Sequence, residues 1–112
     1  MKIVAALLAL SLPALANTGL AATDEDMAAV EALGRLNGIA LACQQPALVS
    51  RARNAVVTTA PKTRSYGEAF EKATNAAYIE QGKGATCPDA ASLASNMAAV
   101  EKHLQESFAK LK

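Results

Sequence analysis

The chain has 112 residues, of which 52% are hydrophobic and 19% are charged, and its formal net charge is only +1. That length accommodates one domain, and the near-neutral balance argues against a nucleic-acid-binding protein, which normally carries a basic excess. The chain has no C-x-x-C-H sequence, which excludes covalent attachment of a c-type haem.

The N-terminal residues have the order of a secretory signal peptide. Lys2 provides a positive n-region, residues 3–10 are apolar, and Pro13 precedes a small-residue pattern that ends at Ala16. The apolar run is far shorter than the roughly 20 residues that a membrane-spanning helix needs. We therefore expect a signal peptide over residues 1–16, cleaved after Ala16 or as late as Ala22. The product is expected to be periplasmic or secreted, without a stable membrane anchor.

The first helix is predicted to begin near Thr23, because Asp26 follows three residues later in the pattern of a capping box. Apolar or small residues then recur alternately four and three positions apart, as on one buried helix face: Ala29, Leu33, Leu36, Ala40 and Cys43. On the same helix Gly34 and Gly38 permit the close approach of another backbone, which we interpret as packing within the domain.

The second helix is predicted to begin at Pro46, where the missing N–H group is not needed, and to end before Pro61. Its expected buried positions are Val49, Ala52, Val56 and Thr59.

No acidic side chain occurs between residues 32 and 67, whereas this stretch carries five positive charges. Arg51 and Arg53 lie on the second helix, and Lys62 and Arg64 lie in the loop after it. We interpret these four residues as a candidate surface for an acidic partner. A solvated face balanced by the acidic start of the first helix is the alternative.

The third helix is predicted from Ser65 to about Gln81, with Glu68 completing a capping box and Gly82 and Gly84 suiting a left-handed C-cap. Its expected buried residues are Tyr66, Phe70, Ala73 and Ala77. A fourth helix, beginning around Pro88, has the clearest apolar stripe: Leu93, Met97, Val100, Leu104, Phe108 and Leu111. No stretch has a period of two, so no strand is expected.

The two cysteines, Cys43 and Cys87, are expected to form a disulfide, because export places them in an oxidising compartment. The first helix ends at Cys43 and the fourth begins just after Cys87. In an up-down-up-down bundle these two helix ends lie together. We therefore predict one all-α domain over residues 23–112, a small four-helix bundle in this order. An orthogonal array of the helices is the alternative.

Met27 and His103 support a second interpretation, because an up-and-down bundle places them at the same end. This layout resembles exported four-helix cytochromes, which bind haem non-covalently through a methionine on the first helix and a histidine on the last. The resemblance implies a haem or metal carrier with these two ligands. His103 has neither a nucleophile motif nor enough neighbouring ligands for a catalytic or specific metal site.

These observations favour a non-enzymatic binding or accessory protein, without a cofactor, that uses a helix face to hold another envelope protein. A chaperone, an assembly factor, an inhibitor or a small immunity protein fits this outline. In size, helical content and a single long-range disulfide, the chain is similar to acid-stress periplasmic chaperones. The sequence leaves the partner and the oligomeric state open.

Overall fold

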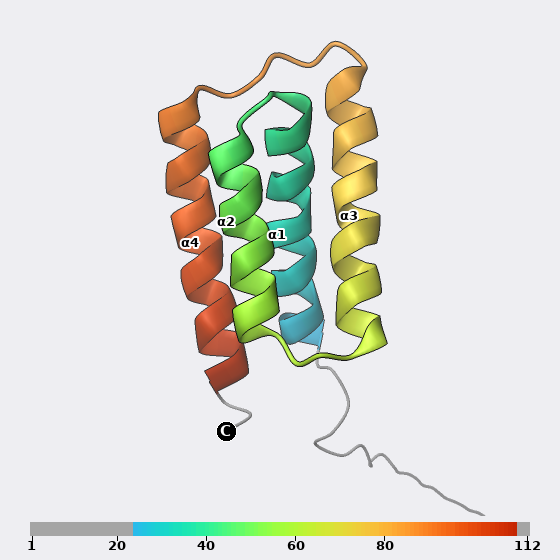
Figure 1. Ribbon diagram of the computed structural model, residues 1–112, viewed down its shortest axis with the longest axis vertical. Coiled ribbons are helices and arrows are strands. Elements are labelled where there is room, and N and C mark those ends of the chain that lie inside the picture. Colours follow the sequence, from blue (N-terminus) through green and yellow to red (C-terminus); the bar gives the residue numbers. More distant parts are fainter. Residues whose placement is uncertain (1–23, 110–112) are drawn as a thin grey trace, which may run out of the picture.

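The computed structural model describes residues 24–109, which form four helices and no strand. In chain order the helices are α1 (Asp24–Ala42), α2 (Pro46–Thr59), α3 (Arg64–Gly82) and α4 (Ala90–Ala109) (Figure 1). The predicted all-α class is therefore confirmed. The expected signal peptide, its cleavage sites and Leu111 lie outside the described residues. Among the helices described, none is long and apolar enough to span a membrane.

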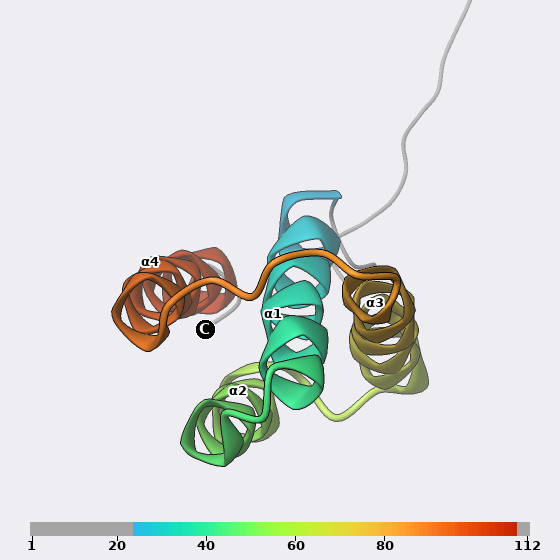
Figure 2. The same ribbon diagram turned by 90° about the horizontal axis from the view of Figure 1, so that it is seen from above.

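Helix α1 lies at the centre, with α3 and α4 on opposite sides of it (Figure 2), and α2 packs against both α1 and α4. The stripe predicted for α1 contains three buried residues, Ala29, Leu33 and Ala40, and two half-buried residues, Leu36 and Cys43. Five further α1 residues are also buried: Asp26, Val30, Gly34, Asn37 and Gly38. The single buried face predicted for this helix was too narrow, because α1 has neighbours on several sides.

Large apolar side chains from α1, α2 and α4 form most of the core. The buried members include Leu33, Leu48, Leu93, Met97 and Leu104. The predicted stripe of the fourth helix is thus confirmed, with Val100 only half-buried. On α2 the structure buries Leu48 and Ala52, whereas the predicted Val49 and Val56 are half-buried.

The contact between α1 and α3 is made largely by small residues, so the two backbones lie close together. A Cβ atom added at Gly34 would lie 2.6 Å from the carbonyl oxygen of Phe70 and 2.9 Å from Cβ of Ala73. A Cβ atom at Gly38 would lie 2.8 Å from Cβ of Ala77. Both glycines therefore serve packing within the domain, as predicted.

A buried polar contact supplements this interface. The Asn37 side-chain amide donates a hydrogen bond to the Thr74 hydroxyl at 3.1 Å. That hydroxyl lies within donating distance of two carbonyl oxygens, 2.8 Å from Phe70 and 3.1 Å from Gly34. These hydrogen bonds satisfy the buried Thr74 hydroxyl and an N–H of the Asn37 amide, whereas the Asn37 oxygen Oδ1 has no hydrogen-bond partner among residues 24–109.

The helix ends follow local sequence signals. Helix α2 begins at Pro46, as predicted, and α3 begins at Arg64, one residue before the predicted start. The predicted capping box of Ser65 and Glu68 is wrong, because the N-cap of α3 is Thr63, whose side chain makes no capping hydrogen bond. The left-handed residue beyond α3 is Gly84, with φ 104°. Helix α4 begins after Asp89, whose carboxylate accepts hydrogen bonds from the backbone N–H of Ser92 at 3.2 Å and its hydroxyl at 2.7 Å. Asp89 thus has the role of an N-cap.

Cys43 and Cys87 form the predicted disulfide, with Cα atoms 5.8 Å apart. Cys43 directly follows α1, and Cys87 lies in the long connection from α3 to α4. This connection crosses the end of α1 (Figures 1 and 2), where the α1–α2 connection also lies. The disulfide therefore fastens the α3–α4 connection to the central helix.

Candidate partner-binding surface

Arg51 is held in a two-point ion pair between α2 and α4. Its Nε and Nη2 atoms donate to the two carboxylate oxygens of Glu101 at 2.9 and 2.8 Å. These hydrogen bonds raise the pKa of the Arg51 guanidinium, although partial desolvation opposes the shift. The side chain of Glu101 is only 19% exposed. Arg51 therefore joins two helices within the molecule.

Two other arginines of the acid-free stretch, Arg53 and Arg64, make weaker contacts. Arg53 lies 3.8 Å from a carboxylate oxygen of Glu71 on α3, and Arg64 lies 3.9 Å from one of Glu68. All four side chains are at least half exposed, with Arg64 at 86%. Single ion pairs between exposed groups contribute about 0–1 kcal/mol. A partner's carboxylates can therefore replace Glu71 and Glu68 at little cost.

Lys62 lies in the turn between α2 and α3 and has no acidic partner among the described residues. Its ammonium group donates to the carbonyl oxygen of Val57 at 2.8 Å. Because a carbonyl carries no net charge, the positive charge of Lys62 remains available to an external anion.

An apolar hollow of about 230 Å³ lies at this same turn, and we call it the corner hollow. Its lining includes Val56, Val57, Ala60, Pro61, Lys62 and Tyr66. The side chain of Val57 is 56% exposed. Arg53 lies one turn before Val57 on α2, and Arg64 begins α3. The corner hollow thus offers apolar surface next to three cations.

Tyr66 forms a fixed wall of the corner hollow. Its ring packs edge-to-face on Phe108 of α4, with centroids 5.1 Å apart. Burial raises the pKa of the Tyr66 hydroxyl, and the negative charge of the buried Asp26 raises it further. Both effects keep this hydroxyl neutral at physiological pH. Because Phe108 of α4 packs against its ring and only 5% of Tyr66 is exposed, this side chain is held in place at the hollow.

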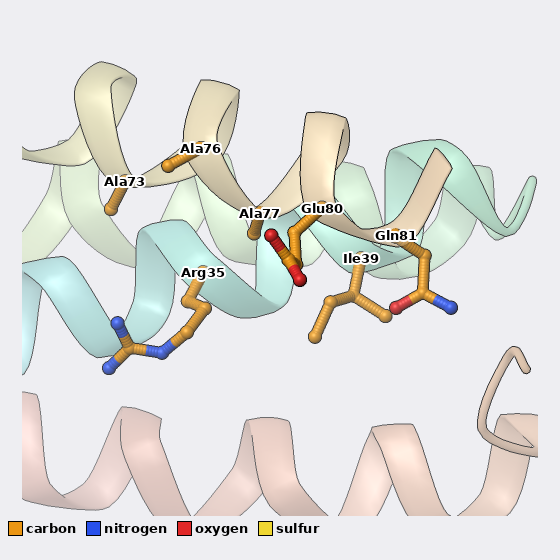
Figure 3. A pocket seen from close by; sticks show the side chains of 7 residues that line it. All are labelled: Arg35, Ile39, Ala73, Ala76, Ala77, Glu80 and Gln81. Atoms are coloured by element: carbon orange, nitrogen blue, oxygen red, sulfur yellow. The ribbon is translucent and has the colours of Figure 1, made fainter. Parts of the chain in front are cut away.

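A second hollow, the α1–α3 hollow, has a volume of about 320 Å³. Figure 3 shows Arg35 and Ile39 of α1 beside three alanines of α3, Ala73, Ala76 and Ala77. Glu80 and Gln81 complete its lining toward the end of α3. Its surface is mainly apolar, with one cation and one carboxylate at the rim.

The two residues implied by the cytochrome resemblance have different surroundings. Met27 is half-buried and packs against the apolar core, whereas His103 is exposed on α4. A haem ligand in a bundle of this kind must project from the helix into an enclosed slot between helices, and an exposed imidazole does not meet that requirement. Among residues 24–109 no three histidine, cysteine or acidic side chains gather as a metal site.

The structure separates the four cations that the sequence placed in one group. Arg51 turns toward α4, whereas Arg53 turns toward α3. Sequence reasoning also missed the apolar component, because Val57 and Tyr66 were not considered with the charges. The available signal was the pair of adjacent valines, Val56 and Val57, shortly before Pro61. A helix with one buried side does not need apolar residues at both positions.

No protein-family model matches the chain, and comparisons with curated proteins and with solved structures also find no match.

Proposed function

We propose that this chain is an exported, non-enzymatic protein that holds another envelope protein through the corner hollow and its cations. The bound segment of the partner carries a hydrophobic side chain next to carboxylates. Export supplies the oxidising environment that the disulfide requires. The helices run up-down-up-down, and the signal peptide over residues 1–16 is removed before the domain functions.

The observation that carries this proposal is the contrast between Arg51 and the three cations at the corner. Arg51 is engaged by short hydrogen bonds to Glu101, whereas Arg53 and Arg64 have long contacts and Lys62 has no acidic partner among residues 24–109. An interface normally combines an apolar centre with a charged rim that steers and orients the partner. The corner hollow and its three cations provide this combination on a small scale.

The chemistry of a chaperone, assembly factor or inhibitor fits this surface. Each of these needs a stable fold with an exposed apolar site, and none needs a nucleophile or a general base. Electrostatic attraction would also make complex formation sensitive to salt, since exposed charges are screened within about 8–10 Å at ordinary ionic strength.

Affinity capture from envelope extract tests the proposal. The tagged protein should recover one partner in stoichiometric amount, and the variant Arg53→Glu/Lys62→Glu/Arg64→Glu should recover at least about tenfold less. Val57→Asp should give a comparable loss, because it places a charge at the apolar centre. The control Lys102→Glu changes an exposed charge on α4, and we expect it to retain the partner.

Two outcomes would contradict the proposal. The first is a partner captured equally well by the triple variant and the wild-type protein. The second is an absence of any stoichiometric partner even at low salt.

Mass spectrometry of the protein from the envelope fraction tests export separately. The expected mass is that of the chain without residues 1–16, or without residues up to 22, and with no free thiol. Recovery of the intact chain from the cytoplasmic fraction alone, with both cysteines reduced, would refute export.

A further inference from the structure

One flank of α3 carries side chains arranged symmetrically about Ala76. Lys72 and Glu80 lie four residues before and after Ala76, and Ala73 and Ile79 lie three residues before and after it. Residues three or four positions apart are neighbours on a helix surface. These five residues therefore form one continuous strip, which we call the α3 flank.

The apolar part of the α3 flank combines a protruding side chain with a hollowed surface. Ile79 is 59% exposed, the highest value among the exposed large hydrophobic residues of the described part of the chain. Ala73 and Ala76 of the α3 flank line both the α1–α3 hollow (Figure 3) and a further hollow of about 220 Å³. Alanine at these positions leaves room for a second helix to approach closely.

The charged part of the α3 flank is self-complementary in one orientation only. Within residues 24–109, neither Lys72 nor Glu80 forms an ion pair. If two copies of α3 lay antiparallel and centred on Ala76, Lys72 of each copy would be level with Glu80 of the other. A parallel pair in register would place Lys72 against Lys72 and Glu80 against Glu80, which is repulsive.

We propose that the chain forms a homodimer in which the α3 helices of two copies pack antiparallel about a two-fold axis at Ala76. Ile79 of each copy lies level with Ala73 of the other and covers the alanine surface around Ala76. Two Lys72–Glu80 ion pairs, one on each side of the axis, fix the register. Such an interface uses the same patch on both subunits, as closed dimers do.

The dimer is independent of the proposed function. The corner hollow lies at the beginning of α3, around Tyr66 and Gly67, whereas the α3 flank is centred more than two turns further along. Each copy therefore keeps its own partner-binding surface, and the two proposals can fail separately.

Sedimentation velocity of the purified protein with its disulfide intact tests the dimer over a concentration series. We expect concentration-dependent dimerisation, which Ile79→Lys abolishes. Lys72→Glu and Glu80→Lys should each raise the dissociation constant at least about tenfold, because each places like charges together. The double variant Lys72→Glu/Glu80→Lys should return the dissociation constant to within about threefold of the wild-type value, while Lys102→Glu should leave that constant unchanged.

Cross-linking tests the position of the axis. Ala76→Cys should form a covalent dimer under mild oxidation, whereas Asn75→Cys, an exposed neighbour outside the strip, should not. Circular dichroism of every variant checks that the helices are retained. The proposal is overturned by a monomer at all concentrations, by a dimer that Ile79→Lys leaves intact, or by a double charge swap that fails to restore association.

Discussion

Glycine at positions 34 and 38 sets the distance between α1 and α3, since any larger side chain would meet the facing backbone or an alanine. Gly38→Ala should therefore lower the free energy of unfolding by about 1–3 kcal/mol, as overpacking of a tight contact does. Urea denaturation measures this change.

The matched control is Gly67→Ala on α3, where a Cβ atom would meet nothing within 4 Å. There the substitution should raise stability by about 0.5–1 kcal/mol, because alanine has the higher helix propensity. Equal stabilisation by both substitutions would show that α1 and α3 are not in close contact.

Asp89 makes the stability of α4 depend on pH. The hydrogen bonds from Ser92 lower the pKa of the Asp89 carboxyl. The ionised Asp89 carboxylate should therefore stabilise the fold fully above its unfolded-state pKa of about 4. This stabilisation should be lost as the pH falls through the lowered pKa that Asp89 has in the folded protein. The melting temperatures of the wild type and Asp89→Ala should differ at pH 7 and converge in strong acid.

Ser95→Ala, at an exposed α4 position that carries no titratable group, is the control for this comparison, and its melting temperature should differ from that of the wild type by the same small amount at every pH. If the melting temperatures of the wild type and Asp89→Ala differed by the same amount down to the lowest pH, Asp89 would not act as the N-cap of α4.

At the element scale, the Arg51–Glu101 ion pair joins α2, the shortest helix, to α4. A double-mutant cycle with Arg51→Ala and Glu101→Ala should give a coupling of about 1 kcal/mol, at the upper end for exposed pairs because the contact is bidentate. The coupling should fall as salt is added. The same cycle on Arg64 and Glu68 should give a value near zero, and equal couplings for the two pairs would contradict the geometry.

The existence of each helix was predictable from apolar spacing, and Pro46 marked the start of α2 correctly. The central position of α1 was not predicted. It buries Val30, Gly34 and Gly38, which lie outside the stripe that the spacing indicated. A period of 3.6 identifies one apolar face, whereas small residues on a second face look neutral in such a pattern. Tertiary neighbours decide whether glycine and alanine are buried.

Across the whole molecule, the disulfide closes a loop between residues 44 positions apart. Loop-closure entropy assigns such a link about 4 kcal/mol, a large fraction of the 5–15 kcal/mol typical of a domain. Cys43→Ser/Cys87→Ser should lose about this amount in urea denaturation. Dithiothreitol should reduce the stability of the wild type to the level of the variant and leave the variant unchanged.

The candidate site was only partly predictable because it is defined by pairing as well as by charge. The sequence identified Arg51, Arg53, Lys62 and Arg64 as basic residues within a stretch, residues 32–67, that contains no acid. It could not show that Glu101, 50 residues away, engages Arg51. Nor could it show that Tyr66 is fixed by Phe108 and forms a wall beside the remaining cations. Such long-range contacts depend on the packing of four helices.

The ring closed by Cys43 and Cys87 contains α2 and α3 in full. A protease that cuts once inside it, for example after the exposed Lys62, produces two fragments that stay linked through sulfur. Trypsin-nicked protein should therefore run as one band on a denaturing gel without reductant and as two bands with it. In a compartment rich in proteases, a single internal cut would leave the molecule in one piece.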